Sequence, residues 1–169
     1  MKRLFFFFFS MVLALTASAQ SVMEDKDAIR DICAKFSILS DQKDGLTQAL
    51  LFTEDAEVTT YIGEHPMMTL KGREQIGQVF HNFINTQETL FHHNGQHLIE
   101  VNGDKANGTL YCFVTTIAKQ NDQRMMTQQG VWYDDEYVKI EGKWYISKRA
   151  SHFTFTDVRQ LPSLPQLNN

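Results

Sequence analysis

Apolar residues recur at helical spacing in three segments of the N-terminal part of the chain. Residues 24–42 predict the first helix, because one stripe along it is apolar. The stripe consists of Ile29, Ile32, Cys33, Phe36 and Leu39. Gly45 follows, as is common after a helix end, and residues 46–52 predict a short second helix. Residues 73–85 predict a third helix. Its apolar face consists of Ile76, Val79, Phe80 and Phe83.

The remaining segments are rich in β-formers and are separated by turn residues. Residues 56–61 predict a first strand, and residues 68–71 a short strand that pairs back on it. Longer strands are expected over residues 92–101, 108–119, 125–140 and 143–156. Three helices followed by a long antiparallel meander indicate an α+β fold. Residues 110–118 are apolar at both parities, which favours a strand covered on both faces. We therefore expect helices on one face of the sheet and a second subunit on the other, in a homodimer.

Residues 1–19 have the pattern of a signal peptide. Lys2 and Arg3 precede an apolar run, and Ala17-Ser18-Ala19 supplies the small residues of a cleavage site. The apolar run is shorter than the roughly 20 residues of a membrane span. We expect an exported protein, periplasmic or secreted, that is free of the membrane after cleavage. An uncleaved anchor is the alternative.

Residues 20–160 are expected to form one domain, because about 150 residues suit a single core. Residues 161–169 predict a flexible tail. The formal net charge is −4, and loss of Lys2 and Arg3 would take it to −6. There is no basic stripe, which disfavours nucleic acid and anionic membrane surfaces as partners.

Two cysteines lie at apolar positions, Cys33 on the first helix and Cys112 within a strand. Buried free cysteines are common, so we expect both to be small core residues. Export would also permit a disulfide between them. That alternative requires Cα atoms within about 7 Å.

Several short motifs occur along the chain in a distinctive order. They are Ala28-Ile-Arg-Asp-Ile32, Leu39-Ser-Asp41, Asp44-Gly45, Leu51-Phe52, Asp55-Ala56, Gly72-Arg-Glu74, His92-His93, Gly103-Asp104 and Gly142-Lys-Trp144. In this order they resemble a SnoaL-like domain of the nuclear transport factor 2-like superfamily, over most of residues 20–160. The resemblance implies a cone, in which a curved antiparallel sheet packs on three N-terminal helices and a pocket opens at the wide end. Scytalone dehydratase, ketosteroid isomerase, polyketide cyclases and non-catalytic proteins share this fold.

Asp41 and His92 are the candidate catalytic residues. Asp41 ends the first helix, where the helix dipole disfavours a negative charge, as suits an acid–base group. The resemblance places a pocket carboxylate at Asp41 and the catalytic histidine of scytalone dehydratase at His92. Contact between them would orient the imidazole ring. The alternatives are an Asp41 that caps the turn and a His92 that packs inertly. Strand alternation puts His92 and His93 on opposite faces.

The chain departs from scytalone dehydratase at several matching positions. The second histidine of that enzyme is Thr116 here, its helix tyrosine is Ser40, and its pocket asparagine is Tyr133. Its tyrosine on the first strand is retained as Tyr61. The tyrosine of the ketosteroid isomerase oxyanion pair is replaced by Phe36.

A mostly apolar pocket with a few polar groups is the expected ligand site. Its predicted ligand-binding residues are Tyr61, Tyr133, Phe36, Phe80, Val131 and Thr116. Plain core packing is the alternative for the apolar members. No metal or cofactor is expected. His93 and His97 lie about 13 Å apart on a strand, and no nucleophile, phosphate-loop or dinucleotide motif occurs.

Three functions remain open from the sequence. The first is an exported domain that binds a small apolar or aromatic molecule. The second is a cofactor-independent lyase or isomerase in which Asp41 and His92 move a proton next to a carbonyl group. The third is a non-catalytic dimeric interaction module.

Overall fold

The computed structural model describes the backbone of residues 2–162 and the side chains of residues 20–162. The helices are α1 (Lys2–Asp41), α2 (Gly45–Ala49) and α3 (Arg73–Asn85). The strands are β1 (Phe52–Ile62), β2 (His65–Lys71), β3 (Thr89–Asn102), β4 (Lys105–Gln120), β5 (Gln123–Ile140) and β6 (Lys143–Gln160). Most of the predicted flexible tail, residues 163–169, lies outside the described residues.

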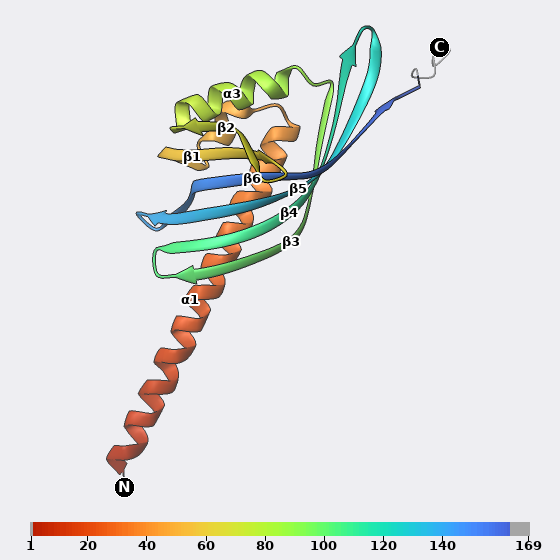
Figure 1. The fold of residues 1–169 in the computed structure, drawn as a ribbon. Coiled ribbons are helices and arrows are strands. Elements are labelled where there is room, and N and C mark those ends of the chain that lie inside the picture. Colours follow the sequence, from red (N-terminus) through yellow and green to blue (C-terminus); the bar gives the residue numbers. More distant parts are fainter. Residues whose placement is uncertain (1, 163–169) are drawn as a thin grey trace, which may run out of the picture.

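The six strands form one curved, open sheet in the order β2-β1-β6-β5-β4-β3. The N-terminal helices pack against this sheet, and the far ends of β4, β5 and β6 extend beyond them (Figure 1). The predicted α+β cone is confirmed. The sheet is mixed, because β1 and β6 pair in parallel while the other neighbours are antiparallel. No hairpin joins β1 to β6, so no tight turn forces them to run in opposite directions.

Helix α1 begins earlier than the hydrophobic stripe predicts. It continues without a break from the predicted signal peptide, and its first half extends away from the sheet (Figure 1). Within residues 20–162, no helical segment is long and apolar enough to cross a membrane.

Helix α2 is shorter than predicted because Phe52 already belongs to β1. The Asp44 side chain caps α2 by accepting a hydrogen bond from the Thr47 amide at 3.1 Å. At its other end, the Leu51 carbonyl accepts a hydrogen bond from the Ile146 amide at 2.9 Å. That bond to β6 draws the chain into the sheet four residues before the predicted strand start.

Tight turns fix the long hairpins of the sheet. Asn121 and Asp122 both adopt positive φ, 50° and 62°, between β4 and β5. Two consecutive positive φ values match the twist of the adjoining strands, and Asn and Asp tolerate this conformation well. Strands β4 and β5 continue up to this turn, so both are longer than the segments of β-forming residues predict.

The core is centred on Phe36 of α1, which is 7% exposed. Its ring meets those of Phe52, Phe80 and Tyr133 edge-on, with ring centroids 6.0–6.3 Å apart. Such edge-to-face contacts add to the gain from apolar burial. The core therefore joins α1, β1, α3 and β5 around one side chain.

Both cysteines are free and buried. This confirms the prediction that they are small core residues rather than a disulfide pair. Burial raises the pKa of the Cys33 thiol and of the Cys112 thiol to about 11. Both side chains therefore act as small, protonated core residues.

Candidate active site

A cavity of about 270 Å³ lies between the concave face of the sheet and the helices. Most of its wall is apolar. The apolar side chains include Phe36, Phe80, Phe83, Leu90, Val114 and Phe153. The polar side chains are Ser40, Gln48, Thr60, His92, Thr116, Gln129, Tyr133, Arg149 and Ser151. An apolar pocket with a few convergent polar groups is the usual form of a small-molecule site.

Asp41 and His92 meet at this cavity. The His92 Nδ1 atom lies 2.6 Å from Asp41 Oδ1, and the His92 amide donates to Asp41 Oδ2 at 3.1 Å. The two residues come from the last position of α1 and from β3, which pack against each other. The His92 side chain is 8% exposed and the Asp41 side chain 26%. The carboxylate thus holds both the backbone and the ring of His92.

This contact decides which histidine nitrogen carries the proton. An ionised carboxylate only accepts hydrogen bonds, so His92 Nδ1 carries the proton that Asp41 accepts. In the neutral ring, Nε2 is then an unprotonated base. His92 lines the cavity whereas Asp41 does not, so Asp41 can influence a ligand in the cavity only through His92. His93 is exposed and faces the opposite side, as strand alternation predicts.

A buried ion pair lies beside the dyad, between Arg149 of β6 and Asp135 of β5. Arg149 Nε and Nη2 donate to the two carboxylate oxygens of Asp135 at 2.8 Å and 2.7 Å. Both residues are 1% exposed. The guanidinium carbon lies 4.3 Å from the ring centres of Phe36 and Tyr133. Burial acts to lower the pKa of Arg149, but the Asp135 charge outweighs it, so the pKa lies above its ordinary value and the side chain stays charged.

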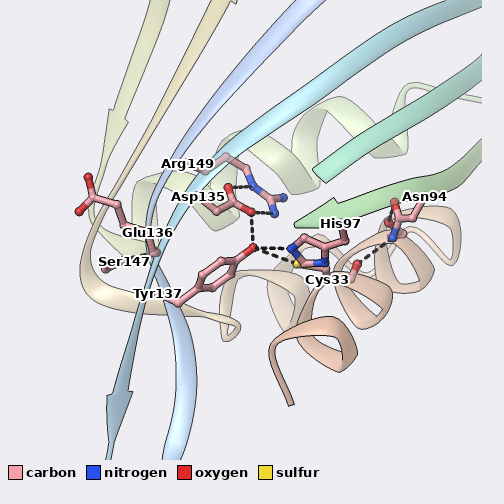
Figure 2. A network of polar contacts seen from close by, with 9 residues as sticks. Cys33, Asn94, His97, Asp135, Glu136, Tyr137, Ser147 and Arg149 are labelled. Carbon is pink, nitrogen blue, oxygen red and sulfur yellow. Dashed lines mark hydrogen bonds and ion pairs between the residues drawn. The ribbon is translucent and has the colours of Figure 1, made fainter. Parts of the chain in front are cut away.

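Further hydrogen bonds surround the Asp135 carboxylate (Figure 2). The Tyr137 hydroxyl donates to Asp135 Oδ2 at 2.8 Å and lies 3.3 Å from the Cys33 sulfur and 3.4 Å from His97 Nε2. Burial, and then the Asp135 charge, raises the pKa of Tyr137. Burial lowers the pKa of His97. Tyr137 therefore stays a neutral donor and supplies a second hydrogen bond to Asp135 Oδ2, beside the one from Arg149.

The sequence analysis missed Asp135, Arg149 and Gln48. Asp135 has the same parity along β5 as Tyr133, and Arg149 the same parity along β6 as Ser151, so both point to the inner face. A charged residue at an inward position of a long strand is the signal that would have identified them. Gln48 carried no such signal, because it lies on a helix of only five residues.

The cavity brings together four of the predicted ligand-binding residues, Phe36, Phe80, Thr116 and Tyr133. Tyr61, also predicted to bind the ligand, does not line this cavity. Thr60 lines the cavity, so Tyr61 points to the other face, where its ring stacks on His152 at 4.7 Å.

Val131, another predicted ligand-binding residue, does not line this cavity either. Val131 is 2% exposed and packs within the core, so it does not form part of the cavity wall. A register shift between Gly130 and Val131 accompanies this placement. Trp132, the next residue along β5, lies on the other face and stacks on His152, with ring centroids 3.8 Å apart.

Among the side chains of residues 20–162, no three His, Cys, Asp or Glu residues gather closely enough to ligate a metal ion. The polar groups of the cavity are instead hydrogen-bonding and acid–base groups.

These features match a known family. The SnoaL-like domain matches residues 21–150 of this chain. The uncharacterised protein Rv2910c of Mycobacterium tuberculosis is 28% identical over 147 residues, which cover 83% of this chain and 94% of that protein. The chain therefore belongs to the SnoaL-like domain family.

Solved structures show the same fold. A scytalone-dehydratase-like protein from Novosphingobium aromaticivorans has a TM-score of 0.73 at 20% identity, covering 89% of this chain and 98% of that one. The hexachlorocyclohexane dehydrochlorinase LinA type 3 from Novosphingobium barchaimii has a TM-score of 0.68 at 21% identity, covering 87% and 97%. The fold is that of the nuclear transport factor 2-like superfamily.

The position of Asp41 generates a prediction about stability. We expect Asp41→Asn to leave the free energy of unfolding within about 0.5 kcal/mol of wild type, or to raise it. The amide oxygen can still accept one hydrogen bond from His92, and the helix dipole disfavours a charge at this end. Urea unfolding measures the change. Asp44→Ala, which removes the cap of α2, should lower it by about 1 kcal/mol as a control. A loss above about 2 kcal/mol for Asp41→Asn would make Asp41 a structural anchor instead.

Proposed function

We propose that this protein is a cofactor-independent lyase or isomerase that removes a proton next to a carbonyl group in a small, mostly apolar molecule. The observation that carries the proposal is the 2.6 Å contact between Asp41 and His92 at the surface of the cavity. A carboxylate that fixes the tautomer and orientation of a histidine is a recurrent arrangement for a general base.

In this mechanism His92 Nε2 takes the proton from the carbon acid, and Asp41 stabilises the imidazolium that forms. Tyr133 lines the same cavity, and burial raises the pKa of its hydroxyl, so the hydroxyl remains a neutral donor. It would donate to the carbonyl oxygen as negative charge develops there. Return of the proton to another carbon gives an isomerase, and loss of a leaving group from the adjacent carbon gives a lyase.

The neighbouring folds support proton abstraction. Both the dehydrochlorinase and the scytalone-dehydratase-like protein are named for eliminations, which need a base beside a leaving group. Thr116 stands where scytalone dehydratase has its second histidine, so the same dehydration is not proposed here. A binding domain without catalysis is the second candidate, because the cavity is mostly apolar.

We expect His92→Gln to lower the rate of proton removal by about 10²- to 10⁴-fold, the usual contribution of a general base. The assay is deuterium exchange at C2 of 1-tetralone in D₂O, followed by ¹H NMR. His93→Gln is the matched control, because His93 faces away from the cavity, and it should keep the wild-type rate. Equal exchange by wild type and His92→Gln would contradict the proposed base. Binding of the ketone without any catalysed exchange would favour the binding domain.

We propose that residues 1–19 direct export, because their pattern of charge, apolar run and small residues is that of a signal peptide. The full chain expressed in a bacterial host should then yield protein outside the cytoplasm. Mass spectrometry should show Gln20 as its first residue. Retention of the full-length chain inside the cell would contradict export.

We also propose a homodimer through the outer face of the sheet, meaning the face turned away from the cavity. Tyr111, Phe113 and Phe155 leave 54%, 38% and 53% of their surface exposed there. The Phe113 and Phe155 rings touch, with centroids 6.0 Å apart. Exposed aromatic groups of this kind are typical of interfaces. Light scattering should give twice the chain mass, and Phe155→Ser should give the single mass. A monomeric wild-type protein would refute the dimer.

A further inference from the structure

Two residues that line the cavity each carry a buried polar atom with no hydrogen-bond partner in the protein. The atoms are Gln48 Oε1 and Arg149 Nη1. Gln48 and Arg149 are each 1% exposed. Buried polar atoms are nearly always paired, by protein, water or ligand. An unpaired acceptor and an unpaired donor on residues that line one cavity therefore indicate what the cavity binds.

The chemical identity of each atom is fixed by its neighbours. The other end of the Gln48 amide lies 2.8 Å from the Phe36 carbonyl oxygen. A carbonyl only accepts, so the amide nitrogen must face it and the amide oxygen must be the free atom. Arg149 uses Nε and Nη2 on Asp135, so Nη1 is the guanidinium nitrogen that has no partner.

Phe36 contacts both of these side chains. Its backbone carbonyl accepts from Gln48, and its ring lies 4.3 Å from the Arg149 guanidinium. Asp135 offsets the charge of Arg149, so this part of the wall offers one donor and one acceptor with little net charge. A neutral group suits it better than a carboxylate does.

We infer that Gln48 and Arg149 recognise a hydroxyl group of the ligand. A hydroxyl accepts from Arg149 Nη1 and donates to Gln48 Oε1, so it satisfies both atoms. A ketone only accepts and leaves Gln48 Oε1 unpaired, and a hydrocarbon leaves both unpaired. This inference rests on the proposed function and deepens it: the substrate class is a hydroxylated ring compound whose hydroxyl is held by Gln48 and Arg149 while His92 acts on another carbon.

A water molecule could satisfy the same two atoms in the free protein. A ligand hydroxyl that replaces such a water reproduces both of its hydrogen bonds, whereas a ketone or a methylene group does not. Ligands that differ only at this hydroxyl therefore differ in affinity because of Gln48 and Arg149, and not because of the apolar part of the cavity.

The test compares 1-tetralol, 1-tetralone and tetralin, which share one ring system and differ at one position. Isothermal titration calorimetry on the full mature protein measures each affinity. We expect 1-tetralol to bind about tenfold to hundredfold more tightly than the other two, since each of those leaves a buried polar atom unpaired. This comparison uses the unaltered protein, so it does not depend on the folding of any variant.

A variant identifies the residue responsible. Gln48→Met keeps the length of the side chain and removes the acceptor, so the preference for 1-tetralol over 1-tetralone should fall to about twofold or less. Circular dichroism checks that the variant is folded.

Each outcome separates the two proposals. If none of the three compounds binds, the proposed function fails together with this inference. If all three bind equally, or if Gln48→Met keeps the preference for the alcohol, the hydroxyl site alone is refuted. A crystal structure in which a resident water stays between Gln48 and Arg149 beneath bound 1-tetralol would refute it as well.

Discussion

The buried pair of Arg149 and Asp135 is the interaction on which the rest of the structure depends. Taking two charges out of water costs several kcal/mol per ion, and only good geometry offsets that cost. Here both carboxylate oxygens are engaged, Tyr137 adds a third hydrogen bond, and two aromatic rings cover the guanidinium. Displacing any of these groups would leave a buried charge without compensation. The pair therefore fixes β5 against β6 and fixes Phe36 against both.

The acid–base dyad follows from the position of Phe36. Asp41 comes five residues later on α1, about 7.5 Å along the helix axis, at the residue where the helix ends. A helix held in place at Phe36 therefore delivers its last carboxylate to a fixed point beside β3. His92 lies at that point, with its ring and its amide both bound to Asp41. The packing of Phe36 in the core therefore also sets the position of Asp41 at the site, because both residues lie on α1.

Much of this could be predicted from the sequence, and the failures have physical causes. Helix α3 and the face of α1 follow from local periodicity, and the approach of Asp41 to His92 follows from family resemblance. The side of the sheet that Tyr61 faces depends on the parity of β1, on which Thr60 rather than Tyr61 lines the cavity. The pairing of β1 with β6 joins distant segments that no turn signal connects. Arg149 escaped prediction because its burial depends on Asp135, and a hydrophobic pattern treats each charge as exposed.

Asp41 is expected to fix the tautomer of His92 so that Nε2 is the base of the proposed mechanism. Long-range ¹H–¹⁵N NMR of the His92 ring at alkaline pH tests it directly, because the two nitrogens of a neutral imidazole have distinct signals. The account predicts that Nδ1 carries the proton and that Nε2 is unprotonated. A ring that carries its proton on Nε2 would contradict the account, since the carboxylate would then face a nitrogen with no hydrogen to donate.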